Sequence, residues 1–164
     1  SPIEIYSEMS PKNDEKRFPV LLRSAWLGLN KSFRRRLVEH GLTPAQFIAL
    51  RWLMESHPSG ISQSDLARLS SSNANNVADL VARMEAEGLL VRTKNETDGR
   101  LKVLSLTSKG RNIYNSARKT AVTLQQEVLS KLGDDERETF LALLDRVAEG
   151  LSDLSETPAV QSKT

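Results

Sequence analysis

Three asparagines lie close together near the middle of the chain, Asn73, Asn75 and Asn76, just after a run of serines. An asparagine amide offers both donors and an acceptor, so it can pair with N6 and N7 of one adenine. Asparagine is equally suited to the start of a helix, where its oxygen accepts a backbone N–H. One helix start needs one cap, which we assign to Asn73, so Asn75 and Asn76 remain candidates for base reading. Ser70, Ser71 and Ser72 could donate to phosphates or could merely fill the turn.

Two charged residues follow on the helix that these asparagines are predicted to open. Arg83 lies away from the apolar positions and could reach a phosphate, although a solvated charge is the alternative. Asp79 would repel phosphate, so we expect it to face a neighbouring side chain or a base amino group.

A basic cluster follows, around a polar segment that contains Asp98-Gly99. It consists of Arg92, Lys94, Arg100 and Lys102, set against Glu96 and Asp98. A narrow minor groove attracts an inserted arginine, and the position of Arg100 at a predicted hairpin tip makes it the strongest single candidate. Solvated strand ends are the alternative for the cluster as a whole. Asp98 is expected to hold Arg100 or to cap the turn.

The composition excludes several other kinds of chemistry. The chain has 164 residues, no cysteine, only two histidines and a net charge of +2, so thiol chemistry and a strongly basic coat are excluded. His40 and His57 lie too far apart for a strong metal motif, so we expect capping or solvated roles and no cofactor. A nucleophile elbow and a phosphate-binding glycine loop are also missing, which disfavours an enzyme. No apolar run could span a membrane and no secretory signal is visible, so a cytoplasmic protein is expected.

Apolar periodicity predicts the elements that position these residues. Helices are expected at about 15–40, 43–56, 62–69, 73–87 and from 108 onward, with Gly41, Gly88 and Gly133 as their ends. Thr43-Pro-Ala-Gln46 predicts a capping box, Ser62 caps the third helix, and Asp134 caps the last. Strands at 89–93 and 102–107 are predicted to form a hairpin.

The predicted fold is mainly α (α+β), a winged helix-turn-helix at 43–107 between dimerisation helices at 15–42 and 108–154. Flexible tails are expected at 1–14 and 155–164. The terminal apolar stripes are longer than the winged unit can cover, which favours a homodimer that reads a palindrome. A monomeric all-α bundle is the alternative.

Four sequence blocks together resemble the MarR family: LTPAQFIALRWL, SQSDLARLS, VADLVARMEAEGLLVR and DGRLKVLSLTSKG. The resemblance implies a dimeric winged-helix regulator of an operator in double-stranded DNA, commonly a repressor, often released by small aromatic or phenolic ligands. The family wing usually carries Asp-Arg-Arg, whereas this chain has Asp98-Gly99-Arg100. Either Arg100 alone enters the minor groove, or the wing binds more weakly.

The resemblance also implies a ligand crevice between the dimer helices and the winged unit. Arg23, Trp26 and Asn30 recur at steps of three and four on the first helix and could line it, with Arg23 pairing a carboxylate. Core packing is the simpler expectation for Trp26 and Trp52.

Two alternatives remain open at this point. The basic run at 34–36 is expected to be a solvated face, or else to contact phosphates or a partner chain. The predicted reading helix has no Lys or Arg before Arg83. A winged helix that binds only other proteins is therefore an alternative. If the chain does bind DNA, backbone amides and the wing must supply its phosphate contacts.

Overall fold

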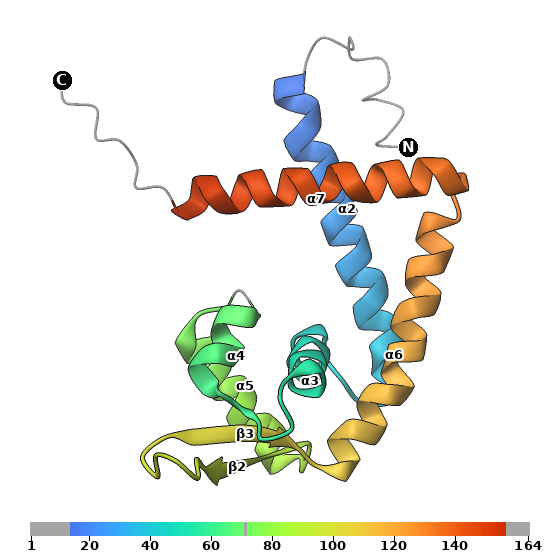
Figure 1. Cartoon of the computed structure of the whole chain (residues 1–164). Helices are drawn as coiled ribbons and strands as arrows, with labels where there is room; N and C mark the ends of the chain where they lie inside the picture. Colours follow the sequence, from blue (N-terminus) through green and yellow to red (C-terminus); the bar gives the residue numbers. More distant parts are fainter. Residues whose placement is uncertain (1–13, 71, 157–164) are drawn as a thin grey trace, which may run out of the picture. The chain divides into compact units, whose positions relative to one another are not determined.

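The computed structural model describes residues 14–70 and 72–156. The chain forms two compact units, Ser1–Val122 and Thr123–Thr164. The first unit contains the winged helix. In chain order the elements are α2 (Asp14–Leu37), η1 (Val38–His40), α3 (Pro44–Glu55), β1 (Ile61–Ser62), α4 (Gln63–Leu69), α5 (Ala74–Ala86), β2 (Leu90–Lys94), β3 (Lys102–Leu106), α6 (Ser108–Leu129) and α7 (Asp134–Glu156) (Figure 1). The predicted fold class, mainly α with a winged helix-turn-helix, is confirmed.

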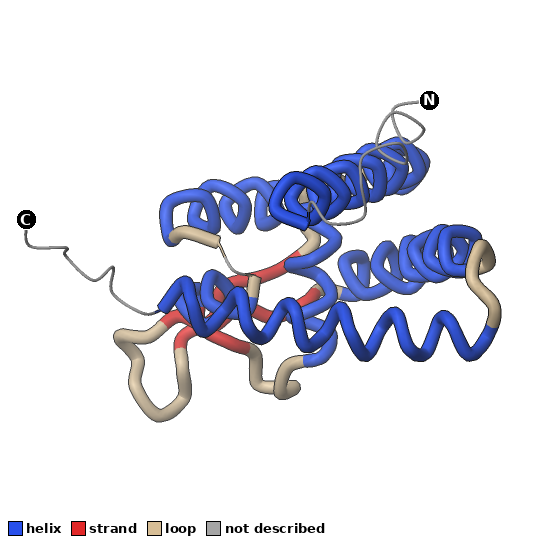
Figure 2. Tube along the Cα trace, turned by 90° about the horizontal axis from the view of Figure 1, so that it is seen from above, coloured by secondary structure: helices blue, strands red, loops and turns tan. Residues whose placement is uncertain are grey.

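The small sheet is antiparallel and has the order β1-β3-β2. Leu90 pairs with Leu106 and Arg92 with Leu104, so β2 and β3 form the predicted hairpin, whose loop projects beyond the helices of the first unit (Figure 2). The short strand β1 was not predicted, because two residues are too few for an alternating pattern. Its pairing of Ile61 with Leu104 joins the hairpin to the start of α4.

Most helix ends follow from their capping residues. Thr43 and Gln46 form the predicted capping box at α3, and the hydroxyl of Ser62 accepts the N–H of Asp65 at α4. Gly41 and Gly88 end their segments with φ of 66° and 75°, a backbone conformation that glycine adopts without strain.

The start of α7 corrects one assignment. The N–H of Arg137 donates to the carbonyl of Gly133, so Gly133 precedes the helix and Asp134 is its first residue. The N–H of Gly133 is satisfied by Glu136, while the Asp134 carboxylate pairs with Arg137 at 2.6 Å. Asp134 is therefore not the cap. Helix α7 also extends to Glu156, beyond the predicted end at 154. Helix α2 begins at Asp14, inside the predicted N-terminal tail. The rest of the two predicted tails, residues 1–13 and 157–164, lies outside the described chain.

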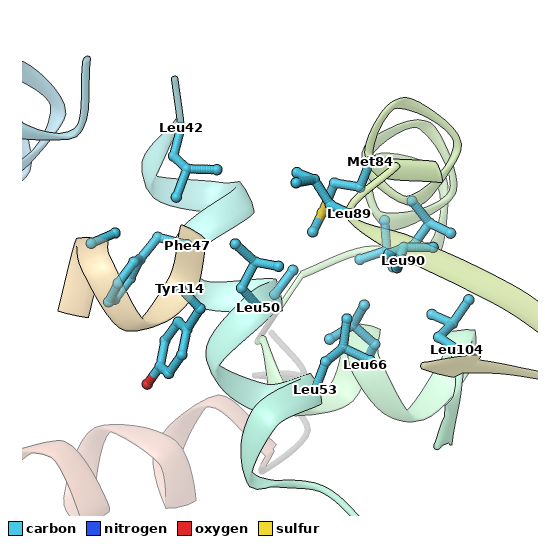
Figure 3. Packing of buried hydrophobic residues seen from close by; sticks show 14 of the residues in the cluster. Leu42, Phe47, Leu50, Leu53, Leu66, Met84, Leu89, Leu90, Leu104 and Tyr114 are labelled. Carbon is cyan, nitrogen blue, oxygen red and sulfur yellow. The ribbon is translucent and has the colours of Figure 1, made fainter. Parts of the chain in front are cut away.

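One apolar core in the first unit joins α3, α4, α5 and the sheet (Figure 3). Phe47 of α3 contacts Phe33 of α2 edge-on at 5.0 Å and Tyr114 of α6 at 5.5 Å between ring centroids. Trp52 packs partly buried against this core, as expected. The same expectation is wrong for Trp26, whose exposed fraction is 62% in the single chain.

Helices α2 and α7 each keep several large apolar side chains exposed. On α2 these are Phe18, Leu21, Leu22, Trp26, Leu27 and Leu29, and on α7 they are Phe140, Leu141, Leu143, Leu144, Val147, Leu151 and Leu154. Each unit by itself therefore leaves an apolar helix face without cover. Within residues 14–70 and 72–156, no helix has both the length and the apolarity needed to cross a bilayer.

Candidate nucleic-acid interface

Helix α5 presents one apolar face to the core and one polar face to solvent. Val77, Val81 and Met84 are buried, and the opposite face begins with Asn75 and continues through Asp79. Positions 75, 79, 82 and 86 share this exposed face because they recur at helical spacing. This face of α5 is the part of the helix that can approach another molecule.

The asparagines separate into two roles. The Asn73 oxygen accepts the N–H of Asn76 at 2.9 Å, which confirms Asn73 as the cap of α5. The side chains of Asn75 and Asn76 are exposed and make no hydrogen bond within the described residues. Their amides are thus free to bind a ligand, and base reading by them stays a prediction.

The turn before α5 is held by backbone bonds. The N–H of Ser70 donates to Leu66 and that of Ser72 to Ala67. Ser72 is exposed, so its hydroxyl can face DNA. The hydroxyl oxygen of Ser70 is buried and has no partner among the described residues, so the expectation that Ser70 could donate to a phosphate is wrong. Ser71, the third serine considered for phosphate contact, lies outside the part of the chain that the structure describes.

The wing tip is shaped by two side-chain turns. The Asn95 oxygen accepts the N–H of Thr97 at 2.9 Å, and the Asp98 carboxylate accepts the N–H of Arg100 at 3.1 Å. Asp98 therefore caps the turn, which was one of its two predicted roles. The Arg100 side chain is exposed and has no partner in the described chain. A Cβ at Gly99 would meet nothing within 4 Å.

The remaining basic candidates differ in how free they are. Arg92 forms an ion pair with Glu85 of α5 at 2.8 Å, which ties β2 to that helix and offsets part of the Arg92 charge. Arg83 and Lys94 are exposed and form no ion pair within residues 14–70 and 72–156. A basic side chain that neutralises a phosphate releases counterions from the DNA, which favours binding. Because Arg83 and Lys94 have no ion pair to give up, they are better candidates for phosphate contact than Arg92.

A buried amide fixes the far end of α5. Gln46 is only 3% exposed, and its Oε1 accepts the N–H of Thr43 while its Nε2 donates to Glu87 at 2.8 Å. The Nζ of Lys109 in α6 donates to the Glu87 carbonyl at 2.8 Å. The sequence identified Gln46 only as a capping residue. Its partner 41 positions away could not be found from spacing along the chain.

The root of the wing is closely packed. The hydroxyl of Thr107 donates to the Gly88 carbonyl at 2.6 Å and accepts the N–H of Gly110 at 3.0 Å. A Cβ on Gly110 would overlap the Leu89 carbonyl oxygen. The chain can therefore approach itself this closely only with glycine at position 110.

The ligand candidates lie on α2. Arg23 and Trp26 are exposed and Asn30 is half-buried. All three lie on one helix, and ligand binding by them stays a prediction. Further along α2, Ser32, Arg35 and Arg36 border an open surface depression of about 390 Å³. Arg34 and Arg35 of the basic run are exposed, as expected for a solvated face, and Arg36 is half-buried.

The histidines serve two different local structures. His40 corrects a prediction: it neither caps a helix nor lies in solvent, because its Nε2 lies 2.8 Å from Thr120 Oγ1 of α6 and its side chain is 13% exposed. His57 is exposed and its Nδ1 contacts Ser59, as expected for a solvated residue. Within the described ranges, no three residues of the metal-ligating types come together.

Comparison with known proteins identifies the class of this site. The MarR family model matches residues 40–101. The putative transcriptional regulatory protein for the hcr operon of Thauera aromatica is 30% identical over 139 residues, which cover 84% of this chain and 81% of that protein. The chain belongs to the MarR family.

Solved structures agree with this membership. The transcriptional repressor CouR bound to a 23-mer DNA duplex is 30% identical, with 86% of this chain and 99% of that chain covered and a TM-score of 0.76. A MarR family protein from Bacillus stearothermophilus is 25% identical, with 87% and 99% covered and a TM-score of 0.73. As a member of the MarR family, the chain is a DNA-binding transcriptional regulator, and its relatives are regulators rather than enzymes.

Proposed function

We propose that two copies of this chain form a homodimer that binds a palindromic operator and represses transcription. The observation that carries the proposal is the exposed face of α5, where Asn75 and Asn76 keep unbonded amides at the start of a winged-helix reading helix. The repressor role is supported by the likeness to CouR, which is itself a transcriptional repressor.

The homodimer is supported by the exposed apolar residues of α7. Five of them, Phe140, Leu144, Val147, Leu151 and Leu154, recur at steps of four, three, four and three. This spacing places them on one stripe, the pattern by which two helices pack along their length. A C2 pair would bury the stripes and would present two α5 helices to the two halves of a palindrome.

We also propose that a small aromatic carboxylate releases the DNA. Trp26 presents an exposed indole on α2, and Arg23 lies less than one helical turn before it. An indole can stack on an aromatic ring, while a guanidinium pairs with a carboxylate, and Asn30 could add a hydrogen bond.

Light scattering of the full chain tests the proposed homodimer. We expect twice the 18.3 kDa chain mass at micromolar concentration, and one dimer on each palindromic duplex. Leu144→Glu should give monomers, because its charge would face the partner helix. Glu149→Gln, on the opposite face of α7, should leave the dimer intact.

The proposed effector is tested separately. Adding benzoate should reduce the DNA complex of the wild type but not that of Arg23→Ala. A wild-type monomer would refute the dimer and the palindrome, and a complex unaffected by benzoate would refute the carboxylate effector.

Arg100→Ala should weaken DNA binding most at sites with A·T-rich flanks. Such flanks narrow the minor groove and concentrate negative potential there, where we propose that Arg100 inserts. The slope of log affinity against log salt concentration should fall by about 1. Gly99→Arg should have the opposite effect, because the space around Gly99 is open. Fluorescence anisotropy at several salt concentrations measures both variants, and equal affinities for wild type and Arg100→Ala on every duplex would exclude Arg100 as a contact.

A further inference from the structure

An acidic side chain lies in the middle of the proposed reading face. Asp79 is exposed on α5, one turn after Asn75 and one turn before Arg83. The spacing to Arg83 would allow an ion pair along the helix, yet within the described residues neither of these two side chains has a partner. Of its two predicted roles, contact with a neighbouring side chain is thus not seen, which leaves the base amino group.

A carboxylate at this position is unfavourable for binding DNA in general. It faces a dense array of phosphates, and like charges brought together weaken association. Helix α5 carries only one basic residue, Arg83, to offset it. The repulsion can be compensated in a specific complex if the carboxylate accepts a hydrogen bond from a base.

Only two bases present an amino donor in the major groove, cytosine through N4 and adenine through N6. Adenine places the N7 acceptor beside its amino group, and that acceptor would repel a carboxylate. Cytosine has no acceptor on its major-groove edge. We infer that Asp79 determines specificity by accepting a hydrogen bond from N4 of a cytosine in each operator half-site; this inference rests on the proposed function.

The helix spacing predicts where the cytosine lies. Asn75 and Asp79 are four residues apart, which is about 6 Å along a helix. Successive base pairs are about 3.4 Å apart, so the cytosine should lie within about two base pairs of the adenine that Asn75 reads.

Selection from a random duplex pool, followed by titration of each single-base change, tests the inference. Asp79→Ala should reduce discrimination at one C·G pair per half-site by about 5- to 150-fold. It should also bind random duplex more tightly than wild type, because one repulsive charge is gone. Asp79→Asn should move the preference at that pair toward adenine, since a carboxamide matches adenine N6 and N7.

Glu96→Gln is the matched control, because it removes one exposed carboxylate from the wing. It should raise affinity for random duplex and leave every base preference unchanged. If Asp79→Ala keeps the wild-type preference at every position, or loses affinity equally on all duplexes together with its melting temperature, Asp79 reads no base. If the wild type itself selects no sequence, the proposed operator fails instead, so the two failures are distinguishable.

Discussion

Gly110→Ala should melt about 6–12 °C below the wild type. The added Cβ would overlap the Leu89 carbonyl oxygen, and a backbone atom at the root of the wing cannot move aside as a side-chain tip can. Overpacking of this kind costs about 3 kcal/mol, and each kcal/mol lowers the midpoint by about 2–4 °C in a chain of this size. Thermal unfolding followed by circular dichroism measures the loss.

Gly99→Ala is the control for this variant, because a Cβ there meets nothing within 4 Å. It should melt within about 1 °C of the wild type, as expected for a surface substitution away from packed features. A Gly110→Ala protein that melts with the control would show that helix α6 does not approach Leu89 as closely as described.

Asn75→Ala and Asn76→Ala should separate base reading from folding. At least one of the two should lose about 1–3 kcal/mol of affinity on the selected operator and little on random duplex, because a bidentate pair to adenine is lost. The melting temperature should stay unchanged, since neither side chain makes a hydrogen bond in the described chain. Anisotropy titrations on both duplexes, paired with melting curves, give the two quantities.

Asn73→Ala is the matched control on the same helix. It removes the oxygen that accepts the N–H of Asn76, so it should lower stability by about 1 kcal/mol and affect both duplexes alike. If Asn75→Ala and Asn76→Ala behave in this way too, the asparagines are structural. Sequence would then be read by the wing or through DNA shape.

Local features of the fold were predictable because each depends on neighbours in the chain. The capping box at Thr43, the cap at Asn73 and the left-handed Gly41 and Gly88 combine residue type with positions a few residues apart. These residues determine where the helices begin and end, and therefore which asparagine side chains are left without a hydrogen bond.

Contacts between distant positions were not predictable. Glu85 pairs with Arg92 across two elements, and Gln46 with Glu87 across 41 positions, and no periodicity relates either pair. The exposure of Trp26 was missed for a related reason. An apolar stripe indicates that a helix face is buried, but it does not show whether residues of the same chain or of another molecule bury it.

The buried Gln46 amide restricts how the reading helix can respond to a signal. Its oxygen completes the cap of α3 and its nitrogen holds Glu87 just after α5, so a pivot of either helix alone would leave a buried polar atom unpaired. Such an atom costs about 1–3 kcal/mol. We therefore expect α3 and α5 to turn as one piece. In the proposed dimer, release would then come from a changed separation between the two reading helices, with the tilt of each preserved.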